Sequence, residues 1–355
     1  MRLRCILPNF ARFWMVVGGA LMLCPSGAAG AIIRVPADQP TLQAAVDAAA
    51  DGDTILVDAG RYAGATVTKR LTILGQPGAE PTLVGAGSPT GWGGLRVGLL
   101  LAAGADGTRI ENLHLDGAGV SDDDTEPLAI GIYGSHLRDV VIRGNTIFGT
   151  VQAITGTAAN HWTIQDNVVS GFTAFVCRTY CGGGSAIVLQ VDRSEGADPS
   201  LPANRPRNNI VRGNAIWGAV PTDLNAFGMA GILLLSADST EVSQNYVAIP
   251  HNPANPMTEA AALLLTAGCC GVPTPWLPGV RFATLLRNQG HDSDWGLIVE
   301  GTGGQNTEGL VRMGNTGRAR IEGVVEMSVS GRAGLRQRAV GPLKAAGALA
   351  VFPLP

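Results

Sequence analysis

The segment Val140-Val-Ile-Arg-Gly-Asn-Thr-Ile-Phe-Gly149 indicates the fold, because it is repeated with small changes along the chain. Each copy has a short alternating stretch, an asparagine and a second short stretch. The closest two asparagines, at 145 and 167, are 22 residues apart. A repeat of this length indicates a solenoid of stacked coils. The other copies are Trp162-Thr-Ile-Gln-Asp-Asn-Val-Val-Ser-Gly171, Asn209-Ile-Val-Arg-Gly-Asn-Ala-Ile-Trp-Gly218, Thr240-Glu-Val-Ser-Gln-Asn-Tyr-Val-Ala-Ile249 and the weaker Arg109-Ile-Glu-Asn-Leu-His-Leu-Asp-Gly117.

A third apolar stretch precedes the copies, so each coil contains three strands. About 22 residues leave no room for a helix between strands, and the pattern therefore predicts an all-β solenoid of three parallel sheets. We expect each asparagine to occupy the bend between the second and third strands, with left-handed backbone angles, and its amide to bond to the next coil. These asparagines are at 112, 145, 167, 214, 245 and 288. The third stretches are 129–133, 153–155, 186–189, 231–235, 261–265 and 296–299.

A short amphipathic helix near residues 41–50 is predicted to cover the N-terminal end of the solenoid. Leu42, Ala45, Val46 and Ala49 fall on one face of such a helix. Pro40 precedes it and Gly52 follows it, as is typical of helix boundaries.

The N-terminal third carries a specific resemblance. Thr41-Leu-Gln-Ala-Ala-Val-Asp-Ala-Ala, continued through Asp51-Gly-Asp-Thr-Ile-Leu-Val-Asp-Ala-Gly-Arg-Tyr62 and Lys69-Arg-Leu-Thr-Ile-Leu-Gly75, resembles the opening of right-handed parallel β-helix proteins of the pectin-lyase-like superfamily. The repeats extend the resemblance to about residue 315. It implies a right-handed parallel β-helix with a short N-terminal capping helix as one domain over residues 31–355. It leaves the activity open, since the superfamily includes lyases, hydrolases, esterases, epimerases and non-catalytic surface proteins.

Residues 1–30 are predicted to be a signal peptide. Three arginines come first, an apolar run follows over residues 13–24, and small residues come next. Twelve apolar residues are too few for a membrane-spanning helix. We therefore expect a secreted or periplasmic protein that is monomeric and has no membrane span.

Charge and cysteine content agree with an exported protein. With 28 acidic and 25 basic residues, the chain has a net charge of −3, which argues against nucleic acid as a partner. Outside the signal peptide the cysteines are Cys177, Cys181, Cys269 and Cys270, an even number that favours disulfides over free thiols or a metal site. They allow either cross-loop pairing or two local bridges.

The superfamily resemblance implies a substrate groove along the third stretches. If Ile132, Ile187, Ile232, Leu263 and Leu297 point inward, the next residue in each stretch points outward. Tyr133 and Gln190 are then the candidate ligand contacts. The outward row is otherwise apolar, which indicates either loops folded over it or a binding strip. Its members are Tyr133, Val188, Leu233, Leu264 and Ile298.

Two further clusters are candidates for chemistry, each with a solvated surface as the alternative. His291, Asp292, Asp294 and Glu300 are the candidate catalytic group. His291 or Glu300 would be the base, and Asp292 or Asp294 the acid or a metal ligand. The acidic loop with Asp122, Asp123, Asp124 and Glu126 offers oxygen ligands to Ca²⁺. Arg205 and Arg207 are expected at the surface.

The sequence thus leaves two classes of function. One is a polysaccharide lyase or glycoside hydrolase, supported by inserted loops at 117–128, 172–185, 192–208, 219–230, 250–260, 268–280 and 289–295. The other is a non-catalytic structural or adhesive surface protein, supported by the scarcity of carboxylates on the groove strands, where Glu300 stands alone. Both classes bind or process extracellular polysaccharide.

Overall fold

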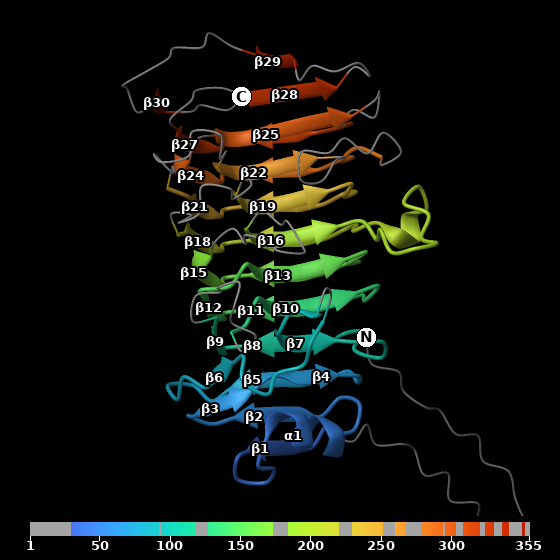
Figure 1. The fold of residues 1–355 in the computed structure, drawn as a ribbon, viewed down its shortest axis with the longest axis vertical. Coiled ribbons are helices and arrows are strands. Elements are labelled where there is room, and N and C mark those ends of the chain that lie inside the picture. The colour runs from blue at the N-terminus through green and yellow to red at the C-terminus, as the bar shows by residue number, and fades with distance from the viewer. Residues whose placement is uncertain are drawn as a thin grey trace, which may run out of the picture.

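The computed structural model describes residues 30–91, 94–117, 127–172, 184–219, 229–250, 260–266, 278–293, 295–302, 308–319, 324–329, 336–340 and 350–351. They form a parallel β-helix of three ten-stranded sheets, as the repeat predicts (Figure 1). The three sheets are called A, B and C, and their strands are given below; each coil passes from sheet C to sheet A and then to sheet B. Neighbouring strands are parallel, except that β29 (Arg336–Val340) and β30 (Ala350–Val351) pair antiparallel at the C-terminal end.

The strands of each sheet follow in spatial order. Sheet A contains β1 (Ile32–Val35), β2 (Thr54–Val57), β5 (Thr72–Gly75), β8 (Arg109–Glu111), β11 (Val141–Arg143), β14 (Thr163–Gln165), β17 (Ile210–Arg212), β20 (Glu241–Ser243), β23 (Thr284–Leu286) and β26 (Val311–Met313). Sheet B contains β3 (Arg61–Ala63), β6 (Thr82–Val84), β9 (His114–Asp116), β12 (Thr146–Phe148), β15 (Val168–Phe172), β18 (Ala215–Gly218), β21 (Tyr246–Ala248), β24 (Gln289–Ser293), β27 (Thr316–Ala319) and β30. Sheet C contains β4 (Ala65–Val67), β7 (Val97–Leu101), β10 (Ile130–Ser135), β13 (Gln152–Thr157), β16 (Ser185–Gln190), β19 (Met229–Leu235), β22 (Ala260–Thr266), β25 (Trp295–Thr302), β28 (Val324–Val329) and β29.

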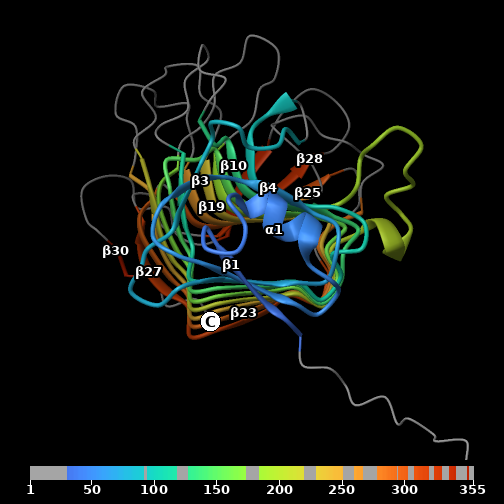
Figure 2. The ribbon, with the colours of Figure 1, turned by 90° about the horizontal axis from the view of Figure 1, so that it is seen from below.

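The predicted capping helix is α1 (Leu42–Ala48), which lies across the N-terminal opening of the coils (Figure 2). Its buried face consists of Leu42, Ala45 and Val46. The Thr41 hydroxyl accepts a hydrogen bond from the amide of Ala44 at the first turn. At the other end Lys69 Nζ donates to the carbonyls of Val46, Asp47 and Ala49 at 2.7–3.0 Å, which satisfies the last turn of the helix.

The interior of sheet C is the predicted aliphatic stack. Ile132, Ile187, Ile232, Leu263 and Leu297 are all buried, and the register places them side by side across β10, β13, β16, β19, β22 and β25 through Ile154. The inward phase inferred from the sequence is therefore confirmed.

Small residues allow each coil to turn from sheet B into sheet C. Gly231 in β19 faces the interior, where an added Cβ would lie 2.2 Å from a methyl of Val247 in β21. At Gly131 in β10 an added Cβ would lie 2.5 Å from the carbonyl oxygen of Ala153 and 3.2 Å from a methyl of Ile147. At Gly231 even the methyl group of alanine would therefore push the two sheets apart.

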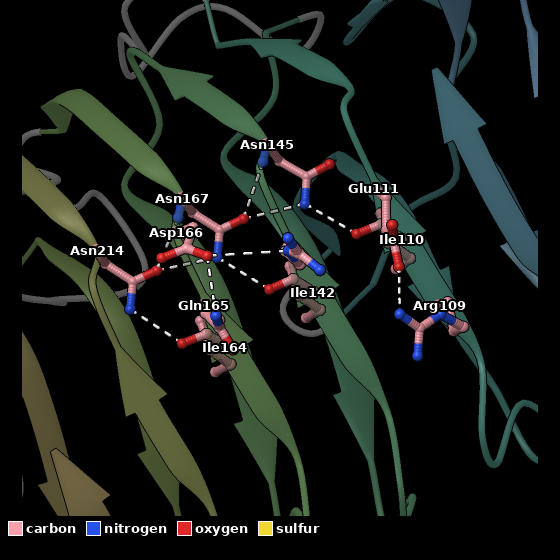
Figure 3. A network of polar contacts seen from close by, with 11 residues as sticks. Arg109, Ile110, Glu111, Ile142, Asn145, Ile164, Gln165, Asp166, Asn167 and Asn214 are labelled. Atoms are coloured by element: carbon pink, nitrogen blue, oxygen red, sulfur yellow. Dashed lines mark hydrogen bonds and ion pairs between the residues drawn. The ribbon is translucent and has the colours of Figure 1, made fainter. Parts of the chain in front are cut away.

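A buried ladder of asparagine side chains joins the coils at the bend between sheets A and B (Figure 3). Asn145 Nδ2 donates to Asn167 Oδ1 at 3.0 Å, and Asn167 Nδ2 donates to Asn214 Oδ1 at 3.0 Å. Each Oδ1 also accepts the backbone N–H of the preceding asparagine. Each Nδ2 also bonds a carbonyl of the preceding coil, such as that of Ile142. The ladder comprises Asn145, Asn167, Asn214, Asn245, Asn288 and Asn315.

The structure corrects the ladder at its N-terminal end. Position 112 does not belong to it, because Glu111 pairs with Arg143 and the ladder position is therefore Leu113. The amide of Leu113 still donates to Asn145 Oδ1 at 3.0 Å. Positive φ angles occur at the residue before each ladder position, such as Asn112 and Gly144, and not at the ladder asparagines. Asparagine is thus selected here for its amide, and the preceding residue makes the left-handed turn.

In the described part of the chain, no helix has the length and apolar character needed to cross a membrane. Residues 1–29 lie outside the described residues, so the signal peptide stays a prediction.

Replacing Ile232 by aspartate should lower the free energy of unfolding by several kcal/mol, because it buries an unpaired charge between two coils. Leu233→Asp is the matched control, since the neighbouring side chain points outward and is half-buried. Thermal melts followed by circular dichroism should show a much larger loss for Ile232→Asp. Equal losses would contradict the inward phase.

Asn167→Ala should lower the free energy of unfolding by about 2–4 kcal/mol, because the buried backbone N–H of Asn145 and the carbonyl of Ile142 lose their partner, and Asn214 Oδ1 loses one of its two donors. Asn204→Ala, in the insert after β16, removes one exposed hydrogen bond and should cost less than about 1 kcal/mol. Denaturant titration measures both. A loss for Asn167→Ala no larger than the control's would show that the ladder adds no stability.

Candidate functional site

The outer face of sheet C presents two columns of side chains that run along the helix axis. The register of β7 to β22 aligns the first column, which is mostly apolar, and β10 to β22 align the second, which is mostly hydroxyl and amide. The first column is Leu100, Tyr133, Thr155, Val188, Leu233 and Leu264. The second is Ser135, Thr157, Gln190, Leu235 and Thr266.

Both predicted ligand contacts belong to this face. Tyr133 packs beside Leu100 against the buried side chains of Val97 and Ile130, and it is half-buried. Gln190, also half-buried, donates from Nε2 to Thr157 Oγ1 at 3.1 Å. Neighbouring side chains therefore fix both groups, and part of each remains exposed.

Five consecutive strands of this face, β10, β13, β16, β19 and β22, contain no charged residue. Their outward side chains are hydroxyl, amide or apolar groups, and none is a general acid or base of the carboxylate type. The partly exposed ones are Tyr133, Ser135, Gln190, Leu233 and Leu264, whereas the buried ones are Thr155, Thr157, Val188, Leu235 and Thr266. Within the described residues, no group of three or more His, Cys, Asp or Glu side chains could hold a metal ion.

Charged residues gather instead at the edge where sheet C turns into sheet A. His136 Nε2 lies 2.7 Å from Asp192 Oδ2, which connects the segments that follow β10 and β16. Partial burial raises the pKa of Asp192, but hydrogen bonds from Ser194 and His136 outweigh it and leave this pKa below its ordinary value.

Arg205 anchors the insert that follows β16, and here the sequence-based expectation was wrong. The side chain is buried rather than at the surface, with 1% of it exposed. Its guanidinium donates to the carbonyls of Ser236 and Gly279 and pairs with Asp238 at 2.7 Å. Arg281 also binds both carboxylate oxygens of Asp238. The polar composition of the insert suggested an exposed side chain. Burial of Arg205 depends on contacts with two other segments, at Ser236–Asp238 and at Gly279, which are distant in the sequence.

The structure places the candidate catalytic residues on different sheets. His291 and Asp292 lie in β24 of sheet B, so residues 289–293 form a strand and not the inserted loop inferred from the sequence. Glu300 lies in β25 of sheet C, about 17 Å along the strand from residue 295 at 3.3 Å per residue. Asp294 lies outside the described residues, as does the side chain of Glu300, and the catalytic grouping stays a prediction.

The remaining predicted residues also lie outside the described residues. They are the acidic group of Asp122, Asp123, Asp124 and Glu126 and the four cysteines Cys177, Cys181, Cys269 and Cys270. Calcium binding and disulfide pairing therefore stay predictions.

Comparison with solved structures supports the fold. The catalytic domain of a GH87 alpha-1,3-glucanase in complex with nigerose is similar, with a TM-score of 0.52 and 12% identity over 86% of this chain and 56% of that chain. A variant of such a domain, also with nigerose, gives a TM-score of 0.50 and 15% identity over 88% and 50%. The surface protein and adhesin PfbA of Streptococcus pneumoniae gives a TM-score of 0.42 and 11% identity over 75% and 66%.

This chain thus spans about half the length of the glucanase chains it matches. No model of a protein family matches the sequence, and no curated protein matches it. At these identities the similarity establishes a parallel β-helix fold and says nothing of the activity, which depends on the side chains.

Arg205→Met should lower the free energy of unfolding by about 2–4 kcal/mol, because the carbonyls of Ser236 and Gly279 lose a buried charged donor. Arg207→Met is the matched control, since Arg207 lies two residues away and is half-buried. Denaturant titration should separate the two variants. Equal midpoints would show that the insert is held by other contacts.

Proposed function

We propose that this protein is exported and binds a neutral extracellular polysaccharide along the outer face of sheet C. The observation that carries the proposal is the absence of charged residues from five consecutive strands of that face. An acidic glycan would require arginine or lysine to pair with its carboxylates, and β10 to β22 supply none. An uncharged chain requires hydroxyl and amide partners beside apolar surface, which the two columns supply.

The shape of the face also suits an elongated ligand. From β10 to β22, five strands span about 19 Å at about 4.8 Å per strand. The partly exposed apolar side chains of Tyr133, Leu233 and Leu264 can contact the carbon-bearing faces of sugar rings. Gln190 and Ser135, which are also partly exposed and belong to the second column, can bond hydroxyl groups. The glucanase domains of similar fold bind nigerose, a neutral disaccharide, which agrees with this class of ligand.

A non-catalytic adhesive or structural role is the second candidate function. It is favoured by the same five strands, which lack the paired carboxylates that a glycoside hydrolase requires. A hydrolase or lyase would draw its acid and base from Glu300 or from the inserted loops. Release of reducing ends or unsaturated products from a bound polysaccharide distinguishes the two functions.

The proposal predicts that the full chain binds soluble neutral glucans more strongly than polygalacturonate in affinity electrophoresis. The double variant Tyr133→Ala/Gln190→Ala should weaken glucan binding about tenfold, or about 1.4 kcal/mol. Gln165→Ala, on the outer face of sheet A, is the control and should bind as the parent does. Preferential binding of polygalacturonate, or parental affinity in the double variant, would exclude this site.

A further inference from the structure

Aromatic side chains stand exposed on a second face of the β-helix, the outer face of sheet B. Phe148 in β12 is 51% exposed and Trp217 in β18 is 40% exposed. The register places them in one column, with Ser170 of β15 between them. Large exposed apolar groups gathered on one face of a protein mark a binding surface more often than isolated ones do.

Three rings on this face lie next to one another along the axis of the β-helix, one pair tilted and one pair stacked. The ring centroids of Trp217 and Tyr246 are 5.5 Å apart with an interplanar angle of 45°. Those of Tyr246 and His291 are 5.0 Å apart at 25°. The three residues come from β18, β21 and β24, which are consecutive strands of sheet B. The stack therefore spans three coils.

Small residues beside the rings leave space for them. Ala248 occupies the column between Trp217 and His291, and its small side chain leaves room for the ring of Tyr246, which comes from the other outward position of the same strand. At Gly171 an added Cβ would lie 2.7 Å from the ring of Phe148, so this ring lies against the strand backbone. Rings held by neighbours lose little conformational freedom when a ligand binds.

The surroundings of the stack indicate an uncharged ligand. The residues beside it in the register are Ser170, Gln289 and Thr316, which supply hydroxyl and amide groups. The ion pair of Arg61 with Asp116 lies beside Phe148, because Asp116 is its register neighbour in β9, three coils from Trp217. At the C-terminal end Asp292 and Arg318 have opposite formal charges. The face thus lacks the cluster of cations that a polyanion requires. The net charge of −3 on the chain also disfavours binding of a polyanion.

We propose that Phe148, Trp217, Tyr246 and His291, here called the aromatic strip, form a second binding site for neutral polysaccharide, separate from the face of sheet C. The C–H groups of a sugar ring pack against an aromatic ring, while the sugar's hydroxyls bond polar groups beside it. The strip provides the rings, and Gln289, Thr316 and Ser170 provide the polar groups. The class of ligand rests on the proposed function, whereas the site rests on the stacked rings alone.

Isothermal titration of the full chain with soluble neutral glucans tests the strip. Trp217→Ala and Tyr246→Ala should each weaken binding about tenfold, since each removes a stacked ring. Phe282→Ala is the matched control, because Phe282 is an aromatic residue that is 57% exposed outside sheet B. It should bind as the parent does. All variants should melt within a few degrees of the parent, which separates lost binding from lost folding.

A spectroscopic readout locates the ligand. Glucan should change the tryptophan fluorescence of the parent, and Trp217→Phe should lose most of this change while its affinity stays within about threefold, because a ring still occupies the position. Unchanged fluorescence in the parent during saturating binding would overturn the proposal.

Different results would exclude the aromatic strip and the face of sheet C. If Trp217→Ala binds as the parent does while Tyr133→Ala/Gln190→Ala does not, the aromatic strip is excluded and the face of sheet C stands. The reverse result would exclude sheet C and leave the strip as the binding site. Absence of glucan binding by the parent would overturn both. Dimers of the parent that Trp217→Ala converts to monomers would identify a second copy of the chain as the occupant and overturn the proposal for the strip.

Discussion

Each ladder asparagine makes hydrogen bonds to the coils on either side of it, and these bonds set the register of the whole β-helix. A bend between two sheets leaves backbone donors and acceptors inside the protein, and buried groups of this kind must be paired. The side-chain Nδ2 of each inner ladder asparagine donates both to Oδ1 of the asparagine in the next coil and to a backbone carbonyl of the preceding coil. Each coil is therefore held in register with its neighbours, whatever the length of the loops inserted between them.

That register gives the outer faces their chemistry. Because equivalent residues of successive coils lie about 4.8 Å apart, a residue type repeated in the sequence becomes a column on the surface. On sheet C the columns are uncharged, and Tyr133 and Gln190 lie within them. On sheet B the same spacing brings Trp217, Tyr246 and His291 to ring distances of 5.0–5.5 Å. Both faces can thus present a periodic surface to a periodic polymer.

Two separate faces would suit a protein that holds a polysaccharide rather than one that only cleaves it. Binding at two sites on one chain raises the overall affinity through effective concentration, even where each site is weak. The five strands β10 to β22 of sheet C lack the carboxylate pair of a hydrolase, whose catalytic groups would have to come from outside these strands. Polysaccharide binding therefore agrees with both candidate functions.

Local periodicity and composition are enough to predict the repeat, the three strands of each coil, the inward stack of Ile187 and Ile232, and the capping helix. The contacts of side chains across coils become visible only in the folded chain. The ladder position is Leu113 and not Asn112, and Arg205 is buried against Asp238. His291, which was expected in a groove loop, lies instead beside Tyr246 on sheet B. The physical reason is that a pairing between coils depends on register, and an inserted loop of variable length hides register from any local pattern.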